Sequence, residues 1–117
     1  MPNKRNSLLF LNDILQAIEK TEIHIQAGKQ EFFENETVQD ATLFRLQTIG
    51  EAVNQLPQEL KLRYPDIRWQ DIVGFRNILA HRYWRIDLNL VWILFEPNGD
   101  IAQLQETVQE LIDDLSS

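Results

Sequence analysis

The chain has 117 residues, of which 44% are hydrophobic and 25% are charged. This is the composition of a folded globular protein rather than of a disordered chain, and the length predicts one domain over residues 1–117. There is no cysteine, which excludes disulfides and thiolate zinc sites. The N-terminus lacks the cleavage site of a signal peptide, and the longest apolar stretch, residues 88–95, is too short to span a bilayer. We therefore expect a cytoplasmic protein without a membrane partner.

The formal net charge of −7 argues at first against a nucleic-acid partner. The charge is unevenly distributed, because residues 61–85 carry six basic and two acidic side chains, a net charge of +4. The six are Lys61, Arg63, Arg68, Arg76, Arg82 and Arg85. A basic segment on an acidic body can bind phosphate only where its charges cluster in space. The alternative is a solvated helix face with no partner.

The first half of the chain shows the periodicity of helices. Apolar residues recur at spacings of three and four from Leu8 to Ile25, which predicts one helix that ends near Gly28. Residues 29–36 are polar and acidic apart from two phenylalanines, and this predicts a loop. A second helix is expected from about residue 37 to 56. Pro57 then begins a short helix, and Pro65 ends it.

The second half is helical as well. A third long helix is expected over residues 70–84, followed by a helix over residues 88–95. The latter is apolar on more than one face, so we expect a second surface to bury it, and another subunit is one source of that surface. Residues 97–100, Pro-Asn-Gly-Asp, predict a turn before a final amphipathic helix. Because alternating strand patterns are absent, the predicted fold class is an all-α bundle of four to five helices.

The third predicted helix carries a polar stripe. On a helical wheel with Arg76 at zero, Asn77 lies at about 100°, His81 at about 140° and Tyr83 at about −20°. The stripe consists of Arg76, Asn77, His81 and Tyr83. Apolar residues at positions 75, 79 and 86 fall on the opposite side and would anchor the helix. Arginine offers a charged fork for phosphate oxygens, histidine exchanges a proton near neutral pH, and asparagine can orient either. The alternative is that the arginine and histidine only neutralise acidic neighbours within the bundle.

Two stretches resemble a known family. An Arg-x4-His-x-Tyr motif lies within residues 69–84. Their sequence is Trp-Gln-Asp-Ile-Val-Gly-Phe-Arg-Asn-Ile-Leu-Ala-His-Arg-Tyr-Trp. Together with residues 49–57, Ile-Gly-Glu-Ala-Val-Asn-Gln-Leu-Pro, they resemble the HepT-like toxins, HEPN-domain ribonucleases of type VII toxin–antitoxin systems. The resemblance extends from the first helix to about Trp92. The Pro97 turn departs from the family pattern and bears on the C-terminal packing rather than on the motif.

The resemblance implies a HEPN-type bundle that forms a homodimer, with an endoribonuclease site between the two subunits. The catalytic residues would be Arg76, His81 and Asn77, with no metal and no cofactor, and the substrate would be RNA, such as tRNA or mRNA. The 2′-hydroxyl of RNA is the nucleophile, histidine transfers its proton, and arginine stabilises the phosphate charge of the transition state. In a dimer, one His81 could act as the base and the other as the acid.

Tyr83 has two interpretations. From spacing alone, it packs its ring while its hydroxyl reaches solvent. In the resembled family this tyrosine is modified with AMP by a nucleotidyltransferase antitoxin of the MNT type. The resemblance therefore implies AMPylation of Tyr83 and that partner. The attached nucleotide would add bulk and negative charge beside the residues that must hold RNA.

Other residues are candidate substrate contacts or structural positions. Trp84 borders the stripe and could stack on a base, Arg45 could reach the site from the second helix, and Arg82 suits contact with the RNA backbone or a partner surface. Gly50 with Ala52 predicts close helix packing.

Three functions are compatible with the sequence. The first is the toxin ribonuclease described above. The second is a non-catalytic HEPN module that binds nucleotide or RNA, or serves as an adaptor, beside a nucleotidyltransferase. The third is a purely structural helical partner that docks through its acidic helices. A nucleotidyltransferase gene next door would favour the first over the third, and a cleavage assay separates the first from the second.

Overall fold

The structure is a computed structural model that describes residues 4–77 and 86–117. In these residues the chain forms seven α-helices and one 3-10 helix, and no strand. The all-α class is therefore confirmed. The number of helices exceeds the predicted four to five, because short helices connect the long ones.

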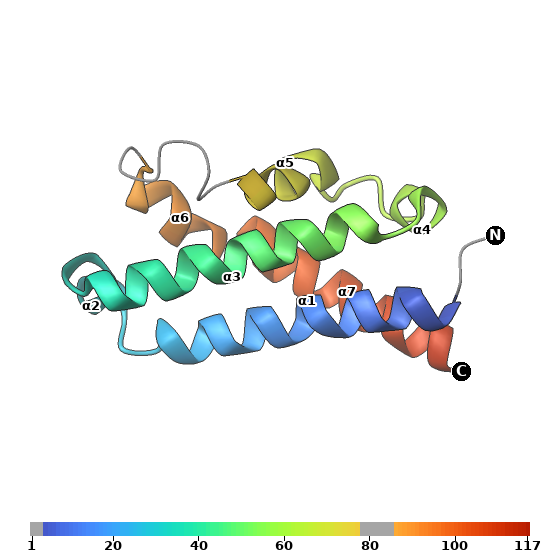
Figure 1. The fold of residues 1–117 in the computed structure, drawn as a ribbon, viewed down its shortest axis with the longest axis horizontal. Helices are drawn as coiled ribbons and strands as arrows, with labels where there is room; N and C mark the ends of the chain where they lie inside the picture. The colour runs from blue at the N-terminus through green and yellow to red at the C-terminus, as the bar shows by residue number, and fades with distance from the viewer. Residues whose placement is uncertain (1–3, 78–85) are drawn as a thin grey trace.

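Two long helices form the centre of the fold. α1 (Lys4–His24) and α3 (Glu36–Gln55) lie side by side and antiparallel, as Figure 1 shows. Their facing sides are fully buried. The fully buried apolar residues of the two helices are Leu11, Ile14, Ile18, Leu46, Ile49 and Val53. α1 ends at His24 rather than near Gly28, so the predicted end of this helix was wrong by four residues.

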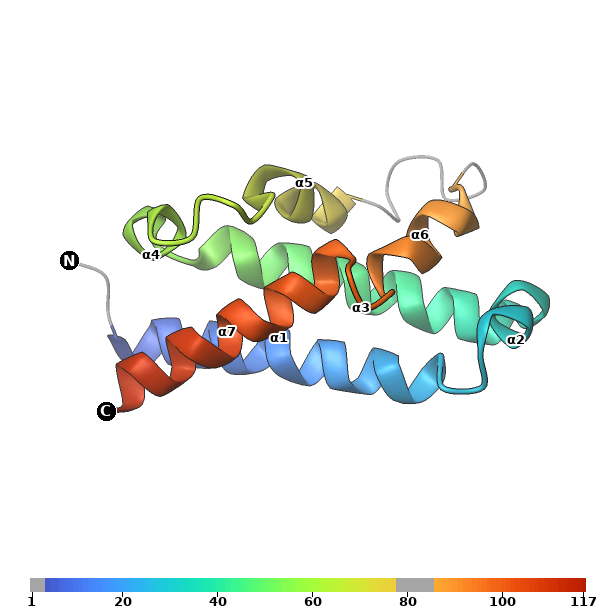
Figure 2. The same cartoon turned by 180° about the vertical axis from the view of Figure 1, so that it is seen from behind.

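α7 (Asp100–Ser116) crosses the back of this pair, as seen in Figure 2. It buries Leu104, Val108 and Leu111 completely, and it packs mainly against α1. The predicted turn at residues 97–100 and the final amphipathic helix are both confirmed.

Residues 29–34 are helical, so the predicted loop was wrong. α2 (Lys29–Glu34) follows Gly28, whose φ of 104° lies in the region that favours glycine. Phe32 is buried, and its ring lies 5.4 Å from that of Trp92 between centroids. The Gln39 amide donates hydrogen bonds to the carbonyls of Phe32 and Phe33, at 2.9 and 3.2 Å. Burial of one aromatic ring thus orders a segment whose overall polarity predicts a loop.

The remaining elements lie along α3, on the side away from α1 (Figure 1). They are α4 (Gln58–Leu62), α5 (Trp69–Gly74), the 3-10 helix η1 (Phe75–Asn77) and α6 (Leu88–Leu94). Pro57 is the N-cap residue of α4, which agrees with the prediction that it begins a short helix. The third predicted helix differs, because α-helical geometry ends at Gly74 and a 3-10 turn follows.

α6 confirms the predicted helix near residues 88–95 and leaves one face open. Val91 is buried, whereas Leu90 and Ile93 are 63% and 52% exposed. The described part of this chain therefore does not supply the second surface that the sequence predicts for this helix. No helix within residues 4–77 and 86–117 has the length and apolar character that crossing a membrane requires.

The role of Phe32 can be tested by comparison with its neighbour. We expect Phe32→Ala to lower the free energy of unfolding by about 3–5 kcal/mol, because it removes a fully buried ring. Phe33 is half-buried, so Phe33→Ala should cost about 1 kcal/mol. Urea unfolding at equal protomer concentration measures both. Equal losses would contradict the assignment of Phe32 as the anchor of α2.

Candidate functional site

The turn that carries Arg76 rests directly on α3. At Gly50 the two backbones come so close that there is no room for a side chain. A Cβ built on Gly50 would lie 2.5 Å from the Arg76 nitrogen, 2.9 Å from the Ile72 oxygen and 3.0 Å from the Phe75 carbonyl carbon. The prediction of close helix packing at Gly50 is therefore confirmed, and its partner is the end of α5 together with η1.

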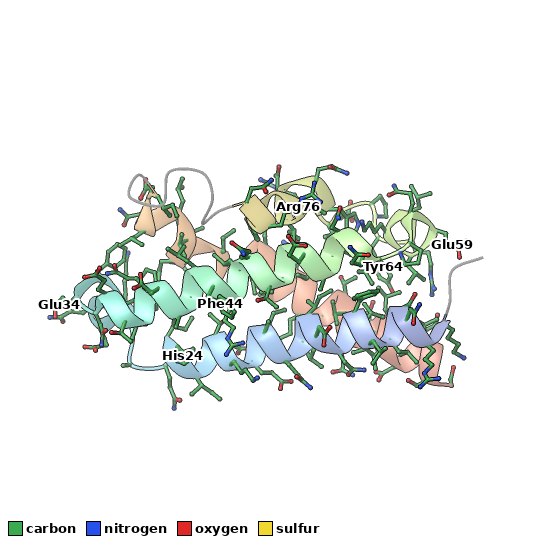
Figure 3. All side chains as sticks on the ribbon, viewed as in Figure 1. His24, Glu34, Phe44, Glu59, Tyr64 and Arg76 are labelled. Atoms are coloured by element: carbon green, nitrogen blue, oxygen red, sulfur yellow. The ribbon has the colours of Figure 1, made fainter. Side chains whose placement is uncertain are left out.

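Arg76 and Asn77 lie at the accessible side of this turn. Arg76 is half-buried and Asn77 is exposed. Figure 3 shows Arg76 on the side of α3 opposite α1, beside α5. Phe75, the preceding residue, packs against the core and anchors the turn, as the sequence predicts.

The 3-10 geometry changes the predicted wheel. A 3-10 helix advances about 120° per residue instead of about 100°, so Arg76 and Asn77 diverge more than an α-helix would place them. The other members of the stripe, His81 and Tyr83, and the candidate contacts Arg82 and Trp84, lie outside the described residues. Their predicted roles stay predictions.

The start of α5 is fixed by the indole of Trp69. Its Nε1–H donates to the carbonyls of Lys61 and Tyr64, each at 3.0 Å. These two bonds tie the connection from α4 to the first residue of α5. Ile72 is fully buried one turn later. The side chains of this short helix therefore hold both of its ends: the first through hydrogen bonds and the second through packing on α3.

Three of the four described cations of the basic segment are paired or buried. Arg63 pairs with Asp114 of α7 at 2.5 Å, and this hydrogen bond raises the pKa of the Arg63 guanidinium. Arg68 lies 3.9 Å from Asp100 at the start of the same helix. Lys61 is buried, and burial lowers the pKa of its ammonium group. Asp114 and Asp100 of α7 thus offset part of the positive charge of this segment.

Arg76 differs from Arg63 and Arg68 in its charge partners. Within residues 4–77 and 86–117 its guanidinium makes no ion pair with a carboxylate. The alternative interpretation, in which Arg76 only neutralises an acidic neighbour, therefore finds no such neighbour in the described part of the chain. A half-exposed guanidinium that is not matched by a carboxylate is suited to an external anion.

Arg45 is not brought to Arg76 within one chain. Its guanidinium lies over the ring of Phe44, 5.5 Å from the centroid. Five residues separate it from Gly50 on α3, which is about 140° around the helix axis. The role of Arg45 as a substrate contact stays a prediction.

Two described carboxylates lie between α1 and α3. Glu51 lies with Asp13 in a cavity of about 190 Å³ between α1 and α3, on the other side of α3 from η1. Among the described residues, no group of three or more histidines and carboxylates is arranged to hold a metal ion.

The contribution of Trp69 was not predicted from the sequence. The indole is indeed buried, but its two hydrogen bonds fix the loop that leads into α5. A tryptophan shortly before the motif gives no signal of which carbonyls it would reach.

The loop that leads into α5 can be tested at Trp69. We expect Trp69→Phe to lower the free energy of unfolding by about 1–3 kcal/mol, because two carbonyls lose their donor. Trp92→Phe is the matched control, since no hydrogen bond of the Trp92 indole occurs within the described residues. Denaturant unfolding of both variants measures the difference. Equal losses would show that the indole N–H contributes nothing specific.

This chain is similar to a known protein family over most of its length. The family model described as "Ribonuclease HepT-like" matches residues 14–113. A protein of Methanocaldococcus jannaschii named as a gamma-glutamylcyclotransferase and putative RNase is 32% identical over 113 residues. That alignment covers 96% of this chain, which spans half the length of that relative. No solved structure matches.

Two further relatives are matched over most of their own length. A second Methanocaldococcus jannaschii protein, named "Putative RNase", is 32% identical over 92% of this chain and 97% of its own. A protein of Thermococcus cleftensis named "Probable ribonuclease HepT" is 31% identical over 76% of this chain and 82% of its own. With the family model matching most of its length, this chain belongs to the HepT-like ribonuclease family.

Proposed function

We propose that this protein is the toxin of a toxin–antitoxin pair and acts as a metal-independent endoribonuclease. The observation that carries the proposal is the complete Arg76-x4-His81-x-Tyr83 motif in a chain of the HepT-like ribonuclease family. The surroundings of Arg76 support it, because the guanidinium is accessible and no carboxylate of the described residues pairs with it.

The reaction would use groups that RNA and this chain supply. His81 removes the proton of a 2′-hydroxyl, and the freed oxygen attacks the adjacent phosphorus. Arg76 stabilises the additional negative charge on the phosphate oxygens, and Asn77 orients one of these groups. The bond to the 5′-oxygen then breaks, and that oxygen takes a proton from a second imidazole. The products are a cyclic phosphate end and a 5′-hydroxyl end.

The need for two imidazoles supports a homodimeric site. One chain carries a single motif histidine, so a two-fold symmetric dimer would place a second copy of Arg76 and His81 in the same cleft. The exposed face of α6, with Leu90 and Ile93, gives such a dimer apolar surface to bury close to the motif in sequence. Arg45, Arg82 and Trp84 are then available as further contacts to RNA.

Control by the antitoxin would act at Tyr83. Transfer of AMP from a nucleotidyltransferase would attach a phosphate and a nucleoside two residues from His81. The bound nucleotide competes with RNA for the same arginine and adds like charge to the path of the substrate. Neutralisation of the toxin therefore requires no change in its fold.

The proposed activity can be tested with purified protein whose mass excludes attached AMP. We expect cleavage of tRNA or mRNA in the presence of EDTA, with cyclic phosphate ends. Arg76→Ala should lower kcat by about 100- to 1000-fold, because it removes a donor to the transition-state charge. His81→Ala should lower it by at least about 100-fold.

Circular dichroism and the oligomeric state serve as controls for folding. Full activity of folded His81→Ala would contradict this chemistry. If the unmodified dimer binds RNA but does not cut it, the protein is instead a non-catalytic RNA-binding or adaptor module. Loss of cleavage in EDTA with recovery on adding Mg²⁺ would contradict metal independence.

Neutralisation can be tested separately at Tyr83. We expect Tyr83→Phe to retain ribonuclease activity, because the phenol hydroxyl is not needed for proton transfer in this scheme. The variant should not gain the mass of AMP when incubated with ATP and the nucleotidyltransferase encoded beside it. Its cleavage rate should then stay unchanged, while that of the wild type falls. Modification and silencing of Tyr83→Phe would place the acceptor elsewhere.

A further inference from the structure

We infer that Gly50 is a positioning residue for Arg76: the absence of a side chain there fixes where the turn η1 holds its guanidinium. This inference rests on the proposed function, because it concerns how the arginine of that site is placed. It assigns a role in the reaction to α3, an element that lies outside the Arg-x4-His-x-Tyr motif.

The contact is one between backbones. The three nearest atoms to a Cβ on Gly50 are the Arg76 nitrogen, the Ile72 oxygen and the Phe75 carbonyl carbon, at 2.5, 2.9 and 3.0 Å. None belongs to a side chain that could rotate away. Any residue other than glycine would therefore force the two backbones apart.

The place of Gly50 within a helix shows that close packing, and not backbone conformation, explains this glycine. Gly50 lies within α3, where glycine is less stable than alanine. Its φ is not positive, so backbone conformation gives no reason for glycine there. The close approach of η1 is the feature of the structure that accounts for it.

Of the two backbones, that of η1 is the one expected to move. α3 is held by side chains that are fully buried on either side of Gly50, including Leu46, Ile49 and Val53. η1 is three residues long and contains no buried residue. A methyl group at position 50 should thus displace the turn, and Arg76 with it. A displacement of about 1 Å at a catalytic group can lower a rate by about 100-fold.

Gly74 provides a matched control. It immediately precedes η1, yet a Cβ placed on it meets no atom within 4 Å. Gly74→Ala also replaces a glycine with an alanine, and it reduces the flexibility of the chain beside the turn. It should leave the cleavage rate unchanged, and it separates the effect of losing a glycine from that of the steric contact.

The test is a double-mutant cycle on RNA cleavage, made below the melting temperature of every variant. Gly50→Ala should lower kcat by about 100-fold relative to the wild type and to Gly74→Ala. If it acts through Arg76, the double variant Gly50→Ala/Arg76→Ala should be no slower than Arg76→Ala alone. A merely structural effect would not depend on residue 76, and the two losses would multiply.

A second variant covers the case in which Gly50→Ala does not fold. Phe75→Leu leaves Gly50 intact and shortens the half-buried side chain that holds the same turn against the core. It should also lower kcat, and again Arg76→Ala should add no further loss in its background. Melting temperature and helical content confirm that this variant is folded.

The outcomes separate the inference from the proposed function. An inactive wild-type protein would overturn the ribonuclease proposal, and the inference with it. An active wild type with equal rates for Gly50→Ala and Gly74→Ala would overturn the inference alone. Losses that multiply with Arg76→Ala, in either the Gly50 or the Phe75 background, would also overturn it. Losses that do not multiply support it.

Discussion

The site depends on the contact between α3 and the turn η1, where one residue without a side chain lets two backbones meet. α3 also packs against α1, so the turn rests on the most deeply buried helix pair of the fold. Trp69 fixes the other end of α5 through two carbonyls. Arg76 is therefore held by the central packing of the protein, although its own side chain is half exposed. The close contact at Gly50 and the packing of Phe75 against the core together hold this short turn in place.

The arginines of the basic segment differ in whether a carboxylate pairs with them. α7 provides Asp114 and Asp100 as partners for Arg63 and Arg68. Surface pairs of this kind add little stability, but they reduce the positive potential that non-specific binding needs. Arg76 is not matched in this way within the described residues. A protein with a net charge of −7 thus presents, in its described part, one arginine that no carboxylate pairs with.

Much of this architecture could be predicted from the sequence, because the long helices carry regular apolar periodicity. α3 and α7 agree with the prediction to within a residue or two. α2 could not be predicted from local polarity, since burial of Phe32 by distant residues determines it. The 3-10 turn after Gly74 lies against α3, and a helical wheel does not contain that contact. For the site, the motif identifies the residues, whereas the partner of Gly50 and the hydrogen bonds of Trp69 follow only from the packing. The roles of His81, Tyr83, Arg82 and Trp84 stay predictions.

The proposed mechanism requires His81 from both subunits in one shared site that cuts RNA. Co-expression of differently tagged wild-type and His81→Ala chains, followed by two successive affinity steps, isolates dimers with one histidine. If one imidazole is the base and the other the acid, these dimers should cleave RNA at least about 100-fold more slowly than wild-type dimers. Half of the wild-type rate would instead show that each chain carries an independent site, and it would contradict the composite mechanism.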